Sequence, residues 1–222
     1  MLPRPPGRDP SSVRRLLDIV VATAGLAAAS VPMLIAAVLI KITSPGPVFY
    51  RQRRIGQHGR PFDFLKFRTM RVGGDGPSVT AEGDARITRV GTILRKWKID
   101  EVPQLWNVLV GDMAVIGPRP EVEKFVALYT PAQRKILDAR PGLASMAQLV
   151  YPHEAEMLKD QPDPERAYVE QLVPRKLEVD LEYERRRSVL SDLKLIGEIA
   201  LLVLGRRARV DTAFHFQPPP SR

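Results

Sequence analysis

The chain has 222 residues, enough for one domain with a substantial core and an appended segment. It contains no cysteine, which excludes disulfides, thiolate zinc sites and cysteine nucleophiles, and its three scattered histidines argue against a histidine-rich metal site. Residues 1–70 carry +8 of the net charge of +9, because they hold 11 Lys and Arg but only three Asp and Glu. These charges bracket an apolar run, which favours contact with anionic lipid over binding to nucleic acid.

The N-terminal region predicts a proline-rich disordered tail over 1–11, followed by a membrane helix. Residues 19–40 are uncharged, and as a helix they would extend about 33 Å, enough to cross a bilayer. Basic residues lie on both sides of this uncharged run, and Lys and Arg are typical of the cytoplasmic ends of membrane segments. Pro32 kinks a helix by removing a backbone donor, and the Ser30 hydroxyl can bond a freed carbonyl. These features favour a re-entrant helix. A single crossing with a kink stays open as the alternative.

The rest of the chain predicts a mostly helical α+β domain. Aromatic clusters at 48–52 and 62–67 flank a glycine-rich turn and indicate a β-hairpin, and 73–83 reads as a mobile loop. Apolar periodicity and start signals predict helices over 87–97, 100–110, 122–128, from 131 onward, 163–173 and 175–204. The end of the last helix is apolar enough to lie in a bilayer interface or to pack on the core. Trp97 and Trp106 are expected in the core, with a membrane interface as the alternative position.

Two adjacent carboxylates, Asp100 and Glu101, form the most informative feature of the sequence. Three cations precede them, and Pro103 and a Gly-Pro-Arg-Pro turn that contains Arg119 follow. At a helix N-terminus an aspartate would be held ionised and could attack phosphorus, while the glutamate could bind Mg²⁺. Helix capping is the more common reason for an isolated aspartate at such a place.

Basic residues near this pair are candidate phosphate ligands. Arg95 and Arg119 could clamp phosphates through two hydrogen bonds each. For Lys66 and Arg68, contact with a nucleotide or lipid phosphate is favoured over a solvated strand edge. Together with the acidic pair, these residues predict a site that handles a phosphate ester with a metal ion.

A series of motifs in fixed order resembles the bacterial sugar transferase family, the monotopic polyprenyl-phosphate phosphoglycosyl transferases. The motifs are RLLDI at 15–19, SPGPVF at 44–49, KFRTM at 66–70, DEVPQLWNV at 100–108, GDM at 111–113, GPRPE at 117–121 and RPG at 140–142. The resemblance runs from about 14 to 205. It implies a disordered tail over 1–11, a re-entrant membrane helix over 12–43, a catalytic domain with interfacial helices over 44–205 and a loose tail over 206–222.

The resemblance also implies an activity at the cytoplasmic face of the bacterial inner membrane. Asp100 would attack the β-phosphorus of a nucleotide diphosphate-sugar, with UDP the expected nucleotide, and form a covalent intermediate that a polyprenyl phosphate such as undecaprenyl phosphate then resolves. Glu101 would ligate Mg²⁺, Arg119 would bind phosphate, and Arg95 falls at a further basic position. The product would initiate assembly of an exopolysaccharide, O-antigen or glycoprotein glycan.

Two departures from the family pattern leave points open. Val31 intervenes between Ser30 and Pro32, which shifts the helix break, and 143–146 differ from the Thr-Gly found in many members, so the sugar is not assigned. The chain looks like the small form of the family, without a multi-span N-terminal region. A non-catalytic membrane scaffold for glycan-assembly enzymes is the alternative function. The sequence does not indicate an oligomeric state.

Overall fold

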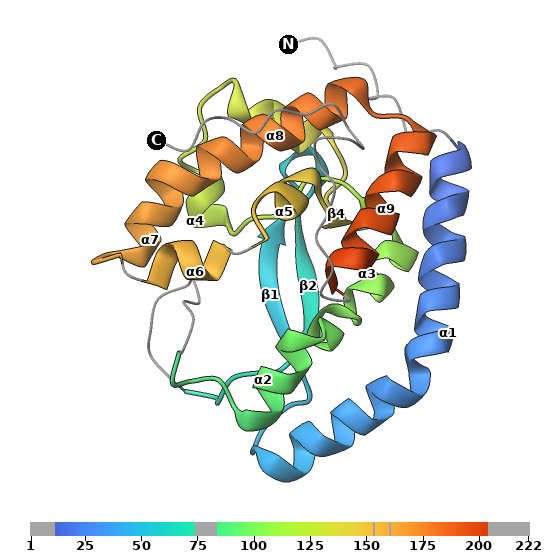
Figure 1. The fold of residues 1–222 in the computed structure, drawn as a ribbon, viewed down its shortest axis with the longest axis vertical. Coiled ribbons are helices and arrows are strands. Elements are labelled where there is room, and N and C mark those ends of the chain that lie inside the picture. Colours follow the sequence, from blue (N-terminus) through green and yellow to red (C-terminus); the bar gives the residue numbers. More distant parts are fainter. Residues whose placement is uncertain (1–11, 74–83, 153, 160, 204–222) are drawn as a thin grey trace.

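A computed structural model describes residues 12–73, 84–152, 154–159 and 161–203. The tails predicted over 1–11 and 206–222, and the predicted loop apart from Gly73, lie outside these residues. In the described part, helices surround a small hairpin and a short parallel strand pair (Figure 1). This confirms the predicted mostly helical α+β class.

The N-terminal helix α1 covers Ser12–Thr43 with Pro32 inside it, and in Figure 1 it runs down one side of the molecule and then bends beneath it. The Ser30 hydroxyl donates to the Ala27 carbonyl at 2.8 Å. The carbonyl that Pro32 leaves without its usual donor is that of Ala28, four residues back, so the serine bonds its neighbour instead. A bent continuous helix therefore replaces the expected break into two helices. The path of α1 through a bilayer stays a prediction.

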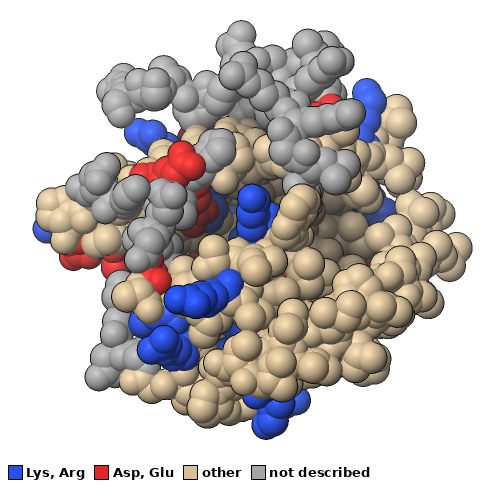
Figure 2. All heavy atoms as spheres, turned by 60° about the horizontal axis from the view of Figure 1, so that its bottom comes forward, with Lys and Arg blue, Asp and Glu red and all other residues tan. Residues whose placement is uncertain are grey.

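Most of the apolar surface of α1 is exposed. The helix is long and apolar enough to cross a membrane by length and composition, and only 11% of its most apolar 18-residue window is buried. Figure 2 shows an uncharged face on the lower right, where α1 lies, beside a hollow around which Lys and Arg side chains gather. Exposed large apolar residues of its second half are Val31, Leu34, Ile35, Val38, Leu39 and Ile42. So large an apolar surface marks α1 as the segment that suits a lipid environment.

The first half of α1 is also bonded into the domain. Arg15 donates to the carbonyls of Val108 and Leu109, each at 2.7 Å, where helix α3 (Gln104–Val110) ends. The backbone N–H of Val115 donates to Asp18 at 2.9 Å. At Gly25 the two helices come so close that a Cβ atom would lie 2.9 Å from the Leu105 side chain. This half of α1 is thus one wall of the domain.

The predicted hairpin is confirmed. Strands β1 (Phe49–Ile55) and β2 (Pro61–Phe67) pair antiparallel around the short turn η1 (Gln57–Gly59). His58 and Gly59 adopt positive φ values of 57° and 75°, which reverse the chain. Alternation along β2 buries Phe62 and Phe64 against the domain.

The remaining elements are mostly short, and most of the predicted helices among them have narrower bounds than the sequence indicates. They are α2 (Arg89–Lys96), η2 (Ile99–Glu101), α3, β3 (Ala114–Ile116), α4 (Glu123–Val126), η3 (Gln133–Asp138), β4 (Gly142–Ala144), α5 (Met146–Val150), α6 (Glu154–Lys159), α7 (Pro164–Ala167), the π-helix η4 (Tyr168–Leu172), α8 (Val173–Arg186) and α9 (Val189–Val203). The helix predicted from 131 is the 3₁₀ helix η3. The helix predicted over 163–173 is α7 followed by η4.

The long helix predicted over 175–204 is wrong, because the chain leaves the helical conformation at Arg187. The Arg187 guanidinium binds the Ile116 carbonyl at 2.7 Å and the Asp192 carboxylate at 2.9 Å, which ties this corner to the core. Ser188 then accepts from the Ser191 N–H at 3.1 Å, and the Ser191 hydroxyl accepts from the Ser188 N–H at 2.8 Å. This reciprocal serine cap starts α9.

The parallel pair of β3 and β4 was not predicted. Ala114 pairs with Gly142 and Ile116 with Ala144. A side chain on Gly142 would collide with the backbone of Gly117, so the glycines of the GPRPE and RPG motifs let these segments touch. The pair fixes the loop that carries Arg119.

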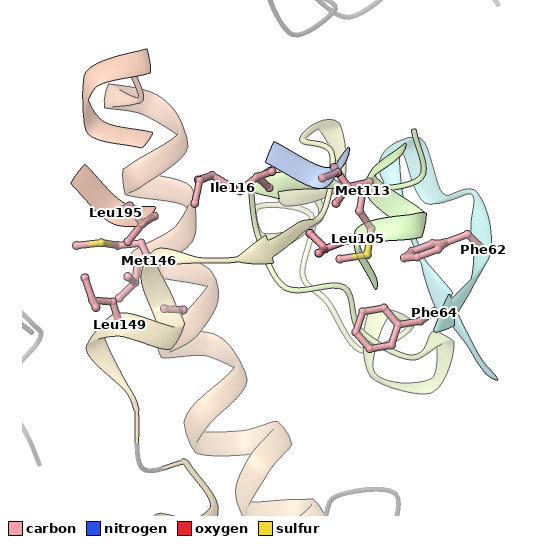
Figure 3. Close-up of a cluster of buried hydrophobic side chains, with 13 residues drawn as sticks. Phe62, Phe64, Leu105, Met113, Ile116, Met146, Leu149 and Leu195 are labelled. Atoms are coloured by element: carbon pink, nitrogen blue, oxygen red, sulfur yellow. The ribbon is translucent and has the colours of Figure 1, made fainter. Parts of the chain in front are cut away.

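The main core runs from the hairpin to α9, as Figure 3 shows for Phe62, Phe64, Leu105 and Leu195. Leu195 is fully buried, and Ile196, Ile199 and Leu202 pack against the same cluster. Of the two alternatives for the end of the last helix, the structure shows core packing. An interfacial position of the surrounding helices stays a prediction.

The expectation that both tryptophans lie in the core is wrong. Trp97 and Trp106 are 53% and 55% exposed. Ile93, Trp97, Trp106 and Val110 place exposed apolar side chains on α2, on α3 and at the turn between them.

Asp180 of α8 predicts an unusual dependence of stability on pH. Its buried carboxylate accepts the Ala147 N–H at 2.8 Å, and burial raises its pKa from 3.8 to about 7. The folded chain therefore keeps this proton up to about pH 7, whereas the unfolded chain loses it near pH 3.8, so this group makes the free energy of unfolding fall as pH rises between these values. We expect Asp180→Asn to remove that decline and to raise the thermal midpoint at pH 8 more than at pH 5.

Thermal unfolding of the detergent-solubilised protein at both pH values tests this expectation. The matched control is Glu178→Gln, which removes an exposed acid from the same helix. An equal shift of the Asp180→Asn midpoint at both pH values would contradict it.

Candidate active site

A tight turn presents the acidic pair. Helix α2 ends at Trp97, and Lys98 follows in the left-handed conformation with φ at 56°, where glycine is the usual residue. The Lys98 N–H donates to the Arg95 carbonyl at 3.2 Å and closes the helix end. The 3₁₀ turn η2 then carries Asp100 and Glu101 directly ahead of α3. A non-glycine residue held at this φ costs free energy and is often found near functional sites.

Glu101 lies in a buried ion cluster. Arg119 Nη2 lies 2.7 Å from Glu101 Oε1, and Arg119 Nη1 lies 3.3 Å from Oε2. Lys66 Nζ approaches Oε1 at 3.3 Å. Burial alone would raise the pKa of Glu101, but the charges of Arg119 and Lys66 outweigh burial and hold this pKa well below its usual range. The carboxylate is therefore ionised and fixed in orientation.

A phenylalanine ring supports the cations. Phe64 is fully buried, and its ring centroid lies 4.6 Å from Arg54 Cζ, 5.2 Å from Lys66 Nζ and 5.7 Å from Arg119 Cζ. The negative face of an aromatic ring attracts such cations. Arg54 also donates to the Pro120 carbonyl, next to Arg119. It thereby ties β1 to the loop that supplies the phosphate-binding candidate.

Sequence reasoning missed this role of Arg54. The available signal was the alternation of β1, which places Gln52 and Arg54 on the same face of the strand. Both nitrogens Nε and Nη2 of Arg54 bond Gln52 Oε1, at 3.1 and 3.0 Å.

Asp100 has a different environment from its neighbour. It is 5% exposed, and its Oδ1 has no hydrogen-bond partner among the described residues. Neither η2 nor α3 has a side-chain cap, so this carboxylate does not serve as the helix cap that an isolated aspartate would suggest. Burial, and then the charge of Glu101, raise its pKa against the opposing charges of Lys66, Lys98 and Arg95. Burial therefore acts against the ionised form of Asp100 that the sequence predicts.

The two remaining basic candidates, Arg95 and Arg68, have different surroundings in the structure. Arg95 Nε donates to the Thr69 hydroxyl at 2.8 Å, and the charge of Arg95 acts on Asp100. Arg68 is 5% exposed and donates to the carbonyls of Ser44, at 2.7 Å, and Pro45. Arg68 therefore holds the turn that follows α1, and a contact with phosphate stays a prediction for it.

Sequence comparisons relate this chain to known proteins. The model of the bacterial sugar transferase family matches residues 10–206. The chain belongs to the bacterial sugar transferase family.

Relatives in this family carry names that specify their substrates. A UDP-glucose:undecaprenyl-phosphate glucose-1-phosphate transferase of Caulobacter vibrioides is 39% identical over 82% of this chain and 66% of its own length. A UDP-N-acetylgalactosamine-undecaprenyl-phosphate N-acetylgalactosaminephosphotransferase of Aeromonas hydrophila is 42% identical over 65% of this chain and 35% of its own length. A UDP-glucose:undecaprenyl-phosphate glucose-1-phosphate transferase of Xanthomonas campestris pv. campestris is 37% identical over 79% of this chain and 35% of its own length. The chain spans less than two thirds of these curated relatives, whose names differ in the sugar.

Within this member of the bacterial sugar transferase family, Glu101 is the residue that would hold Mg²⁺. Its Oε1 contacts Arg119 and Lys66, and its Oε2 lies 3.3 Å from Arg119 Nη1. Among the described residues, no three or more His, Asp or Glu side chains form a group that could hold a metal. Mg²⁺ commonly combines one or two carboxylates with phosphate oxygens. A single carboxylate would therefore hold Mg²⁺ only together with oxygens of a bound diphosphate, and Mg²⁺ binding at Glu101 stays a prediction.

Lys66 predicts a pH limit on anion binding by this family member. Burial lowers its pKa from 10.5 to about 8, although Glu101 partly opposes this shift. As pH rises through about 8, the free site loses a positive charge, so we expect the dissociation constant for pyrophosphate to increase between pH 7 and 9. Lys66→Arg should remove most of this increase, because a guanidinium stays charged.

Calorimetric titration with pyrophosphate in a chelator at several pH values measures the effect. Lys135→Arg changes an exposed lysine of η3 and should keep the wild-type pH dependence. A wild-type affinity that does not change between pH 7 and 9 would show that Lys66 does not contribute its charge to binding.

Proposed function

We propose that the chain transfers a sugar 1-phosphate from a UDP-sugar to a polyprenyl phosphate through a covalent intermediate on Asp100. The observation that carries the proposal is the contrast between two adjacent carboxylates. Glu101 is ionised and bonded to Arg119, whereas the buried Oδ1 of Asp100 has no hydrogen-bond partner in the part of the chain that the structure describes. Family membership and the names of the relatives support the same chemistry.

In the first step, an ionised Asp100 oxygen attacks the β-phosphorus of the UDP-sugar. The bond between this phosphorus and the oxygen that bridges the two phosphates breaks, and UMP leaves with that oxygen. Arg119 and Lys66 supply positive charge near the phosphoryl oxygens, and burial strengthens this stabilisation. When bound at Glu101, Mg²⁺ would neutralise charge on the diphosphate.

In the second step, a phosphate oxygen of the polyprenyl phosphate attacks the phosphorus held on Asp100. The bond from the aspartyl oxygen to phosphorus breaks, so the carboxylate is regenerated and polyprenyl-diphosphate-sugar is released. Covalent catalysis divides one transfer into two displacements, and each has one incoming and one leaving oxygen. The product would begin a bacterial glycan such as an exopolysaccharide, an O-antigen or a glycoprotein glycan.

We also propose that α1 enters the inner membrane and returns to the cytoplasmic face. Basic residues flank both ends of its apolar run, Pro32 removes a backbone donor inside the helix, and Figure 1 shows that the helix bends. The exposed apolar second half supplies the lipid-facing surface. Arg68 holds the turn at Ser44 and Pro45, so the exit from the membrane is bonded to the strand that ends near the active site.

A membrane scaffold without catalysis explains the same apolar helix but not the acidic pair. A buried carboxylate oxygen without a partner destabilises the fold, and a scaffold gains nothing from it. An active site uses such a group as its reactant. This difference favours the enzyme.

We expect Asp100→Asn and Asp100→Ala to fold, to bind membrane and to lose transfer by on the order of 10³-fold or more. Incubation with UDP-glucose or UDP-N-acetylgalactosamine and Mg²⁺, without lipid acceptor, should release UMP and leave a sugar-phosphate adduct on Asp100, which mass spectrometry locates. Asp63→Asn changes a half-exposed acid on β2 and should keep the activity. If the Asp100 variants turn over at the wild-type rate, the covalent mechanism is wrong.

For the membrane topology, we expect the two sides of α1 to be labelled from the same compartment. The natural chain has no cysteine, so Ser12→Cys and His58→Cys each create a single reactive thiol at an exposed residue. A membrane-impermeant maleimide should label both thiols in inverted vesicles and neither in intact spheroplasts. Labelling of Ser12→Cys in spheroplasts would indicate a single crossing.

A further inference from the structure

Gln104, the first residue of α3, is an unexplained buried polar residue. It is fully buried, and neither its Nε2 nor its Oε1 has a hydrogen-bond partner in the described structure. A buried amide without partners costs about 1–3 kcal/mol of stability. Leucine or methionine would fill such a place in a helix without that cost. The amide therefore calls for a purpose beyond packing.

Gln104 follows Asp100 by four residues, across the junction between η2 and α3. Val102 and Pro103, which link η2 to α3, both have right-handed helical angles, with φ of −55° and −58°. Backbone hydrogen bonds across this junction join residues three apart, Val102 to Ile99 at 3.2 Å and Leu105 to Val102 at 3.0 Å, so the chain stays in tight helical turns from Asp100 to Gln104. The buried Oδ1 of Asp100 and the buried amide of Gln104, both without a hydrogen-bond partner among the described residues, thus lie on successive turns.

Asn107 shows that the face of α3 that holds Gln104 can satisfy its polar groups. One turn beyond Gln104, its Oδ1 accepts the Leu65 N–H at 3.1 Å, and its Nδ2 donates to the Asp63 carbonyl at 2.8 Å. These bonds use the edge of β2 that faces away from β1. Alternate residues of a strand point their N–H groups the same way, so the Phe67 N–H faces the same side.

We propose that Gln104 is a positioning residue for the nucleophile: its Nε2–H donates to Asp100 Oδ1 in the reacting enzyme and directs Oδ2 at the phosphorus. The inference rests on the function proposed above and deepens it. Attack by Oδ2 leaves Oδ1 as the carbonyl oxygen of the aspartyl phosphate, and the amide bonds that oxygen before and after the attack. A neutral amide orients the carboxylate without pairing its charge, whereas a lysine or arginine would hold the charge in an ion pair.

Gln104→Met tests the proposal, because methionine keeps the length of the side chain and removes both polar atoms. We expect the thermal midpoint to stay equal or rise, the dissociation constant for UDP to stay unchanged, and the single-turnover rate of UMP release at saturating UDP-glucose or UDP-N-acetylgalactosamine to fall about 10- to 100-fold. A purely structural amide would change the midpoint and leave the rate of the folded enzyme unchanged. Asn107→Leu is the matched control, since it removes a bonded amide from the same face and should lower the midpoint.

Each outcome decides the question. A Gln104→Met enzyme that releases UMP at the wild-type rate overturns the proposal. Gln104→Leu serves as a second variant, and failure of both variants to fold would show that the amide is bonded in the resting structure, directly or through water, which also overturns it. A wild-type chain that forms no adduct with either donor counts against the proposed function itself, and an adduct with an unaffected Gln104→Met rate counts against Gln104 alone.

Discussion

The buried carboxylate of Glu101 is the constraint on which the rest of the site depends. A charge removed from water needs nearby opposite charge and hydrogen bonds, and here Arg119 and Lys66 provide both. Lys66 comes from the hairpin and Arg119 from the loop that the β3–β4 pair fixes, so neutralising Glu101 requires both segments to dock. Arg54 and the ring of Phe64 hold the two cations side by side. One electrostatic requirement therefore assembles the site from three separate parts of the chain.

The adjacent carboxylates have opposite properties because of what surrounds them. Charge pairing lowers the pKa of Glu101, whereas burial raises that of Asp100. Two acids whose environments shift their pKa values in opposite directions commonly have different roles in a catalytic site. Here Glu101 binds the cations Arg119 and Lys66, and under the proposed function the Asp100 carboxylate is left to react.

Much of the arrangement could be predicted from local sequence, and the rest depends on contacts between distant segments. The hairpin and the helical nature of α1 and α2 follow from patterning and turn residues, and the structure brings Asp100, Glu101, Lys66 and Arg119 together. The β3–β4 pair has strands of three residues, too short to show alternation, and Arg187 ends α8 through a bond to Ile116 that only the folded chain contains. The prediction for Trp97 and Trp106 was wrong because large aromatic residues are usually buried in a core. Gln104 gave no signal, since only burial reveals that its amide lacks partners.

The close packing of α1 against α3 has a geometric consequence. Arg15 binds the end of α3, and Gly25 brings α1 against Leu105 of the same helix, which follows closely on the turn that carries Asp100. The first half of α1 and Asp100 are therefore linked through α3. If α1 lies in the bilayer as proposed, its depth there sets the height of Asp100 relative to the headgroups, and so the level at which an acceptor phosphate can reach it.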